Sequence, residues 1–115
     1  MPHFVVDCSS DILDMENFKT ILDKLHMAAT NSGLFDEADI KIRLNPYKEN
    51  YIVGGKMESF IHVFANIMEG RTTEQKAHLS KTIVRVLKDM FPNIPFIAIN
   101  IRDFEKATYC NKNMI

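Results

Sequence analysis

Two strand–helix–strand units follow one another along the chain, and this repetition constrains the fold more than any other feature. Short β-branched or alternating stretches at 3–8, 39–44, 60–68 and 96–102 are typical of strands. Apolar residues recur at helical spacing between the members of each strand pair. The expected helical stripes are Phe18, Ile21, Leu22, Leu25 and Ala29 in the first unit, and Leu79, Ile83, Val86, Leu87 and Met90 in the second.

Residues that favour helix ends flank both helical patterns. Ser9, Ser10 and Asp11 are candidate N-caps of the first helix, and residues 31–33 (Asn-Ser-Gly) are typical of its end. Thr72 is expected to cap the second helix, and Gln75 completes a possible capping box. Pro92 and Pro95 close it. The pattern therefore predicts two helices of ordinary length.

This order of elements predicts an α/β (α+β) fold. A helix that crosses between two strands usually makes those strands parallel, with a right-handed connection. We expect one domain, residues 1–115, with repeat units at about 2–45 and 59–104. The units would join into a four-stranded mixed sheet with two helices on one face. Apolar residues occur on both faces of the 60–68 strand, so a partner subunit is expected to cover the other face.

Two segments lie outside this pattern. Residues 45–57 form a connection punctuated by Pro46 and the pair Gly54-Gly55, and 51–53 could form a short hairpin arm. The tail from Glu105 to Ile115 has no decisive pattern. Neither segment belongs to the repeated units.

Composition excludes several classes of protein. The net charge is -1, which argues against a nucleic-acid binder with a basic face. No apolar run approaches the roughly 20 residues that span a bilayer, and the first residues do not resemble a signal peptide. Two cysteines, Cys8 and Cys110, do not make a disulfide framework. We expect a cytoplasmic protein that binds neither membrane nor nucleic acid.

Pro2 is the first candidate for chemistry. Removal of Met1 is favoured by a small following residue, and it would leave a secondary amine at the chain end. Ordinary α-amino groups titrate near roughly 7.7–8.0, and burial or nearby cations lower that value. A base with a pKa near the working pH is suited to proton transfer. Proline after methionine is common, however, and by itself this position favours no function.

Two basic segments are candidates for anion binding. Arg71, within Glu69-Gly70-Arg71-Thr72, ends a strand and opens a helix, where backbone amides and the helix dipole suit an anion. Lys41 and Arg43 are two residues apart on a strand and therefore share a face. Taken alone, each segment is better explained as a solvated surface.

Other reactive residue types show no recognisable arrangement. The four histidines lack metal-ligand spacing, and His62, in mid-strand, is expected to be a satisfied core residue. Cys8 lacks the setting of a nucleophile. Gly54-Gly55 has neither the lysine of a phosphate loop nor a dinucleotide fingerprint. These residues indicate neither a metal site nor a nucleotide-binding loop.

Together these segments resemble one family. Residues 2–9 (Pro-His-Phe-Val-Val-Asp-Cys-Ser) resemble the mature N-terminus of 5-carboxymethyl-2-hydroxymuconate isomerases. Residues 67–76 (Ile-Met-Glu-Gly-Arg-Thr-Thr-Glu-Gln-Lys) are similar to the strand-to-helix signature of the tautomerase superfamily, which includes 4-oxalocrotonate tautomerase and macrophage migration inhibitory factor. Gly33-Leu34-Phe35 and the strand at 40–45 match more loosely. The resemblance covers most of the chain, but not the tail after Phe104.

The resemblance implies a homotrimer whose active sites lie where subunits meet and need no metal and no organic cofactor. Pro2 would take the proton of a dienol hydroxyl and return it to a distant carbon, in the homoprotocatechuate branch of 4-hydroxyphenylacetate catabolism. Arg71 matches a family arginine that binds a substrate carboxylate. Lys41 stands where the family has a second arginine, and Arg43 matches another, so we expect Lys41 or Arg43 to supply the second cationic contact.

Two alternatives stay open at this level. The same amine and cations could serve a related tautomerase, decarboxylase or dehalogenase that acts on another small anionic substrate. Sheets of this topology also occur in small-ligand regulatory modules without enzymatic activity, and in such a module Pro2 would have no special role.

Overall fold

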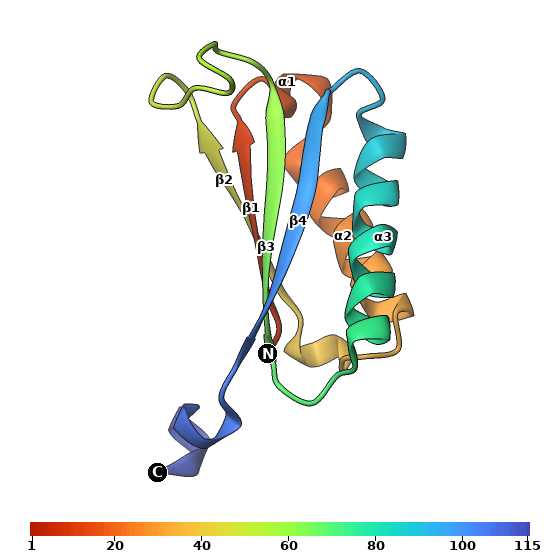
Figure 1. The fold of residues 1–115 in the computed structure, drawn as a ribbon, viewed down its shortest axis with the longest axis vertical. Coiled ribbons are helices and arrows are strands. Elements are labelled where there is room, and N and C mark those ends of the chain that lie inside the picture. The colour runs from red at the N-terminus through yellow and green to blue at the C-terminus, as the bar shows by residue number, and fades with distance from the viewer.

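The sheet has the strand order β2-β1-β3-β4, and both strand–helix–strand units contribute two strands to it (Figure 1). The computed structural model describes residues 1–115. β1 is parallel to β2 and β3 is parallel to β4, whereas β1 and β3 are antiparallel. The predicted four-stranded mixed sheet is confirmed. The elements are β1 (His3–Ser9), α1 (Ile12–Met15), α2 (Phe18–Asn31), η1 (Glu37–Asp39), β2 (Lys41–Tyr47), β3 (Phe60–Met68), α3 (Thr73–Met90), β4 (Phe96–Phe104), η2 (Lys106–Thr108) and η3 (Lys112–Met114).

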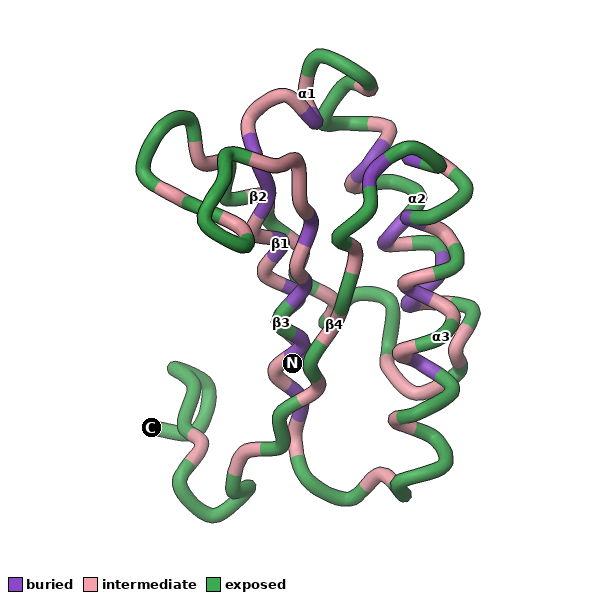
Figure 2. The backbone as a smooth tube through the Cα atoms, turned by 45° about the horizontal axis from the view of Figure 1, so that its top comes forward, coloured by how far each residue is buried: buried purple, intermediate pink, exposed green.

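α2 and α3 lie together on one face of the sheet, and the core fills the space between the two layers (Figures 1 and 2). Alternate residues of the central strands face the helices, because side chains alternate across a strand. The core includes Phe4, Val6, Cys8, Ile61, Val63 and Ala65 from the sheet, and Ile21, Leu25, Ala28, Ala29, Leu79, Ile83 and Leu87 from the helices. No helix is both long and apolar enough to cross a membrane.

The first helical region differs from the expectation because it is two helices. α1 is a single turn, and Glu16 is extended behind it (φ -150°). The Asn17 side chain then accepts a hydrogen bond from the Thr20 backbone N–H and caps α2, a role that sequence reasoning missed. Phe18 was expected in the core but is 62% exposed, because α2 turns it away from the sheet.

The connection between the two units also differs in detail. β2 continues through Pro46 to Tyr47, which an edge strand permits because it has an unpaired side. The expected hairpin arm is a tight turn in which an antiparallel bridge joins Val53 to Lys56. β4 runs on to Phe104, and the tail then swings away from the body past the N-terminus (Figure 1).

The sheet face away from the helices is open in the single chain. His62 lies on this face, where its Nε2 is 2.6 Å from Asn100 Oδ1 and its ring stacks on Phe64. The expectation of a core histidine was wrong, because the even-numbered residues of β3 point away from α2 and α3. Phe64 and Phe96 are 39% and 47% exposed. Polar and aromatic side chains are therefore mixed here.

Candidate active site

The N-terminus, the end of β3 and the start of α3 meet at one end of the sheet (Figure 1). Pro2 comes directly before the central strand β1, and its side chain is fully buried. Its carbonyl accepts a hydrogen bond of 3.1 Å from the Lys41 N–H. Pro2 is therefore both buried and hydrogen-bonded to the first residue of β2.

Arg71 is fixed at this end of the sheet by three contacts. Its Nη2 donates to the carbonyl of Leu34 at 2.6 Å, and its Nη1 donates to the carbonyl of Met68 at 3.1 Å. The guanidinium carbon lies 5.0 Å from the centre of the Phe35 ring, which is a cation–π distance. Gly70 has a backbone φ of +121°, which residues with a side chain rarely adopt. This residue turns the chain from β3 toward α3.

Two side chains cap the N-terminal end of α3. The Thr72 side chain accepts from the Gln75 N–H, and the Gln75 side chain accepts from the Thr72 N–H. The predicted capping box is confirmed. The box engages the N–H groups of Thr72 and Gln75, so these two amides are not available to an anion, and the fixed side-chain cation at this site is Arg71.

Lys41 and Arg43 lie on the same sheet face but differ in position. Lys41 pairs with His3 in the sheet, and its Nζ donates to the Asp39 carbonyl at 3.1 Å. Arg43 is farther along β2, and its Nη1 is 3.0 Å from His3 Nδ1. Burial, and then the charges of Arg43 and Lys41, lower the pKa of His3.

The N-terminal amine is surrounded by charge. Burial lowers the pKa of the Met1 amine below 8.0, and Lys41 lowers it further through its charge and a hydrogen bond. Arg71 also lowers this pKa, whereas Asp39 raises it. Burial and positive charge both favour the neutral amine. The structure thus brings Lys41 and Arg71 to the chain end.

A cavity of about 270 Å³ opens beside the N-terminus. It is lined by Met1, Asp39, Met68, Arg71, Tyr109 and Asn111. Sequence reasoning missed Tyr109 and Asn111, because the tail has no periodicity and only the path of β4 brings it here. Asp39 was expected to begin a strand, but it lies in the η1 turn.

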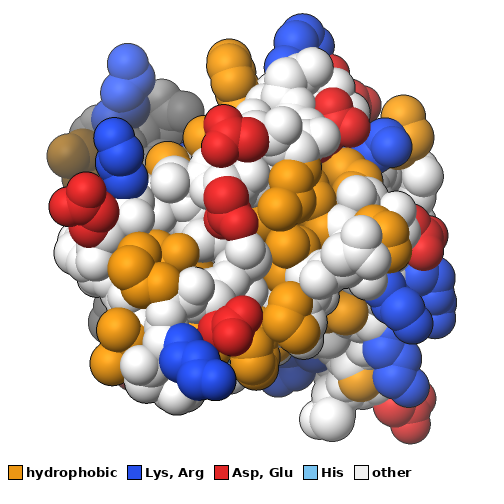
Figure 3. Space-filling model, turned by 90° about the horizontal axis from the view of Figure 1, so that it is seen from above, with side chains coloured by type: hydrophobic (Ala, Val, Ile, Leu, Met, Phe, Trp, Pro, Cys, Tyr) orange, Lys and Arg blue, Asp and Glu red, His pale blue; other side chains and the backbone are white.

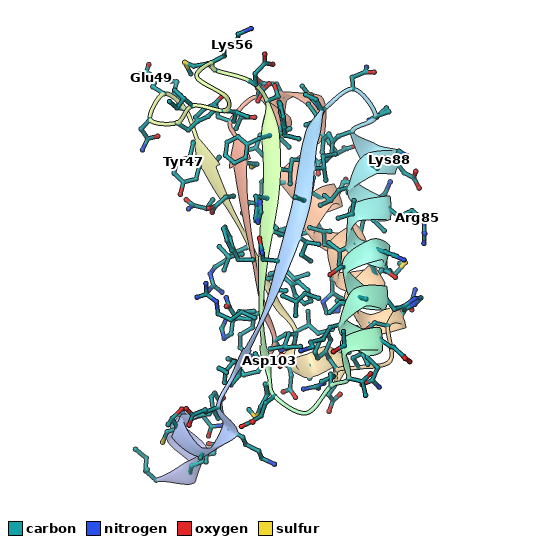
Figure 4. All side chains as sticks on the ribbon, viewed as in Figure 1. Tyr47, Glu49, Lys56, Arg85, Lys88 and Asp103 are labelled. Carbon is teal, nitrogen blue, oxygen red and sulfur yellow. The ribbon has the colours of Figure 1, made fainter.

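Other reactive and charged side chains have structural roles. The thiol of Cys8 is buried in the core, and this burial raises its pKa to about 11, so it is not an activated nucleophile. Lys76 is 2.9 Å from Asp103 and connects α3 to the end of β4, where Figure 4 labels Asp103. No group of three or more His, Cys, Asp or Glu side chains is placed to hold a metal ion. At the opposite end of the molecule, acidic, basic and apolar side chains are interspersed (Figure 3).

Comparison with known proteins decides the family. The family model of 5-carboxymethyl-2-hydroxymuconate isomerase matches residues 2–115. The chain belongs to this family. It is 24% identical over 92 residues to the 5-carboxymethyl-2-hydroxymuconate Delta-isomerase of Escherichia coli, an alignment that covers 79% of this chain and 73% of that protein.

Solved structures of similar proteins have the same fold as this chain. A 5-carboxymethyl-2-hydroxymuconate isomerase from Deinococcus radiodurans R1 superposes with a TM-score of 0.83 at 20% identity, over 96% of this chain and 88% of that one. A fused 4-OT wild-type asymmetric trimer superposes with a TM-score of 0.81 at 15% identity, over 96% and 92%. Membership of the isomerase family sets aside the non-enzymatic module.

Proposed function

We propose that this isomerase converts the enol form of 5-carboxymethyl-2-hydroxymuconate to its keto isomer, with Pro2 as the proton carrier. Removal of Met1 frees the Pro2 nitrogen. This amine takes the proton of the dienol hydroxyl, the double bonds shift, and the protonated amine returns the proton to the distant carbon. A ketone forms, and the base is regenerated. The reaction belongs to aromatic catabolism.

One observation supports this proposal above the others: the chain end is fixed beside two cations and a cavity. Burial and positive charge already lower the pKa of the Met1 amine. The Pro2 nitrogen is one residue farther in and belongs to a buried ring, and the Pro2 carbonyl is held by the Lys41 N–H. The same surroundings would keep a freed Pro2 amine neutral and able to accept a proton near neutral pH.

Arg71 is suited to bind one carboxylate and to stabilise developing charge. Two of its N–H groups are engaged by the carbonyls of Leu34 and Met68, which fix the plane of the guanidinium. Its remaining N–H groups are free for a substrate carboxylate. A fixed cation draws electron density toward itself as the conjugated acid gains negative charge, and this lowers the barrier without reorganisation.

Lys41 is the better placed of the two candidates for the second cationic contact. It shares the N-terminal surroundings with Arg71, whereas Arg43 lies against His3. Lysine keeps the charge of an arginine but lacks its planar fork. This difference makes a related small anionic substrate the second candidate, for tautomerisation, decarboxylation or dehalogenation.

We also propose that the molecule works as a homotrimer. The open sheet face exposes Phe64 and Phe96 among polar side chains, and a second copy could cover it. The fused 4-OT trimer has the same fold.

The experiment compares two forms of the protein that differ only at the N-terminus. Cleavage of a fusion yields either a free Pro2 or a Pro2 preceded by one glycine, and intact mass verifies each product. We expect the free form to turn over 5-carboxymethyl-2-hydroxymuconate, and the extended form to lose at least about 100-fold in kcat, the scale of general acid–base catalysis. Equal turnover by the two forms would refute the role of Pro2. Turnover of only a monocarboxylic enol would favour the second candidate function.

A further inference from the structure

The C-terminal tail, residues 105–115, forms part of the cavity wall, and the mechanism proposed above gives it no role. Tyr109 and Asn111 line the cavity together with Arg71 and the N-terminus. Tyr109 is the only residue of the tail that is not exposed. Its ring packs against Phe104, with 5.9 Å between the ring centres. The tail is therefore in contact with the site.

Glu69 connects this tail to the segment that carries Arg71. Its Oε2 accepts a hydrogen bond of 2.6 Å from the Lys106 N–H, and its own N–H donates to the Phe104 carbonyl at 3.1 Å. Only Gly70 separates Glu69 from Arg71. The same turn thus carries the cation of the cavity and holds the first residues of the tail.

The hydrogen bonds inside the tail determine what the Tyr109 hydroxyl can do. The Asn111 Oδ1 accepts from the Asn113 N–H at 3.0 Å, which orients the amide so that its Nδ2 faces Tyr109. That Nδ2 donates to the Tyr109 hydroxyl oxygen at 3.3 Å. Because the phenol oxygen already accepts this bond, its single O–H is free to donate elsewhere. A free donor in the same cavity wall as Arg71 suits an anion.

We propose that Tyr109 is a specificity-determining residue, whose hydroxyl donates to a second carboxylate of the substrate, and that Glu69 is the positioning residue that holds the tail in place for this contact. The proposal rests on the function proposed above. It makes the cavity selective for enols with at least two carboxylates, one at Arg71 and one at Tyr109.

The first experiment removes only the hydroxyl. Tyr109→Phe keeps the ring on Phe104, and Tyr47→Phe is the matched control, since Tyr47 lies at the opposite end of the sheet (Figure 4). We expect Tyr109→Phe to raise KM for 5-carboxymethyl-2-hydroxymuconate about tenfold, with kcat within about twofold, because a hydrogen bond to a charged group is lost. The control should match the parent protein. An unchanged KM, or a loss confined to kcat, would overturn the recognition role.

The second experiment tests the anchor without turnover. Glu69→Ala removes the acceptor of the Lys106 N–H, whereas Glu69→Gln retains a side-chain oxygen. We expect Glu69→Ala to speed hydrogen exchange of the Lys106 amide, followed by NMR, and to raise KM as Tyr109→Phe does, and Glu69→Gln to restore both. Unchanged exchange in Glu69→Ala would overturn the anchoring role. If the parent protein turns no substrate over, the proposed function fails, while the exchange measurement still tests the anchor.

Discussion

Replacement of Arg71 separates its part in the fold from its part in catalysis. Arg71→Ala deletes hydrogen bonds to the carbonyls of Leu34 and Met68 and a cation–π contact with Phe35. Each hydrogen bond contributes about 1 kcal/mol net, and the ring contact about 0.5 kcal/mol. The free energy of unfolding should therefore fall by about 2.5 kcal/mol, which for a chain of this length corresponds to a loss of about 10 °C in Tm.

Urea unfolding followed by circular dichroism, at one fixed protein concentration, measures this change. Arg71→Lys should lose about 1.5 kcal/mol, because an ammonium group keeps charge and one donor direction but not the fork. Arg85→Ala is the control: Arg85 is an exposed arginine of α3 that points away from the body (Figure 4), and its loss should change stability by less than about 0.5 kcal/mol. If Arg71→Ala destabilises no more than Arg85→Ala, the assigned structural contacts are wrong.

Kinetics measured well below the unfolding transition test the second role of Arg71. We expect kcat/KM of Arg71→Ala to fall about 100-fold, or about 2.7 kcal/mol, because a charge-assisted contact to the substrate carboxylate is lost. Arg71→Lys should recover part of this loss. A full loss of stability with unchanged kcat/KM would show that Arg71 is a structural residue only.

Three further predictions follow from local features. Burial and the charge of Lys41 lower the pKa of the Met1 amine, and we expect the same for the amine of the freed N-terminus. The acidic limb of the pH profile of kcat/KM should therefore lie below pH 8. Lys41→Ala should move this limb to higher pH, whereas Lys41→Arg should not. The Cys8 thiol is buried with a pKa of about 11, so iodoacetamide at pH 8 should modify Cys110 alone in the folded protein, and both cysteines only after unfolding, as read by peptide mass. Gly70→Ala should cost about 1–2 kcal/mol in urea unfolding because φ is +121° there, and a wild-type unfolding curve would contradict the strained turn.

The architecture could be predicted from the sequence because it depends on local patterns. Alternation at 96–102 and the helical stripe around Leu79, Ile83 and Leu87 indicate which faces are apolar. The capping box at Thr72 is likewise a pattern of neighbouring residues. A right-handed crossover in each unit then leaves few topologies, and the observed one is among them.

The errors occurred where burial depended on a neighbour distant in the sequence. Phe18 has the spacing of a core residue, but α2 begins only at that position and turns it outward. His62 stands in an apolar strand, yet the register of β3 places it on the open face beside Asn100. Neither outcome follows from local spacing, because both depend on how the elements are placed against each other.

The candidate site, like the fold, combines features that follow from local sequence with features that depend on the tertiary structure. The sequence by itself determined the two strand–helix–strand units, the turn at Glu69-Gly70-Arg71 that leads into the Thr72 cap, and the position of Pro2 directly before the first strand. These features depend on residues that are adjacent in the chain. Only the tertiary structure decided that Lys41, rather than Arg43, accompanies Arg71 at the N-terminus, and that Tyr109 lines the cavity. Strand register and the path of β4 fix those neighbours, since they bring together residues that no local pattern relates.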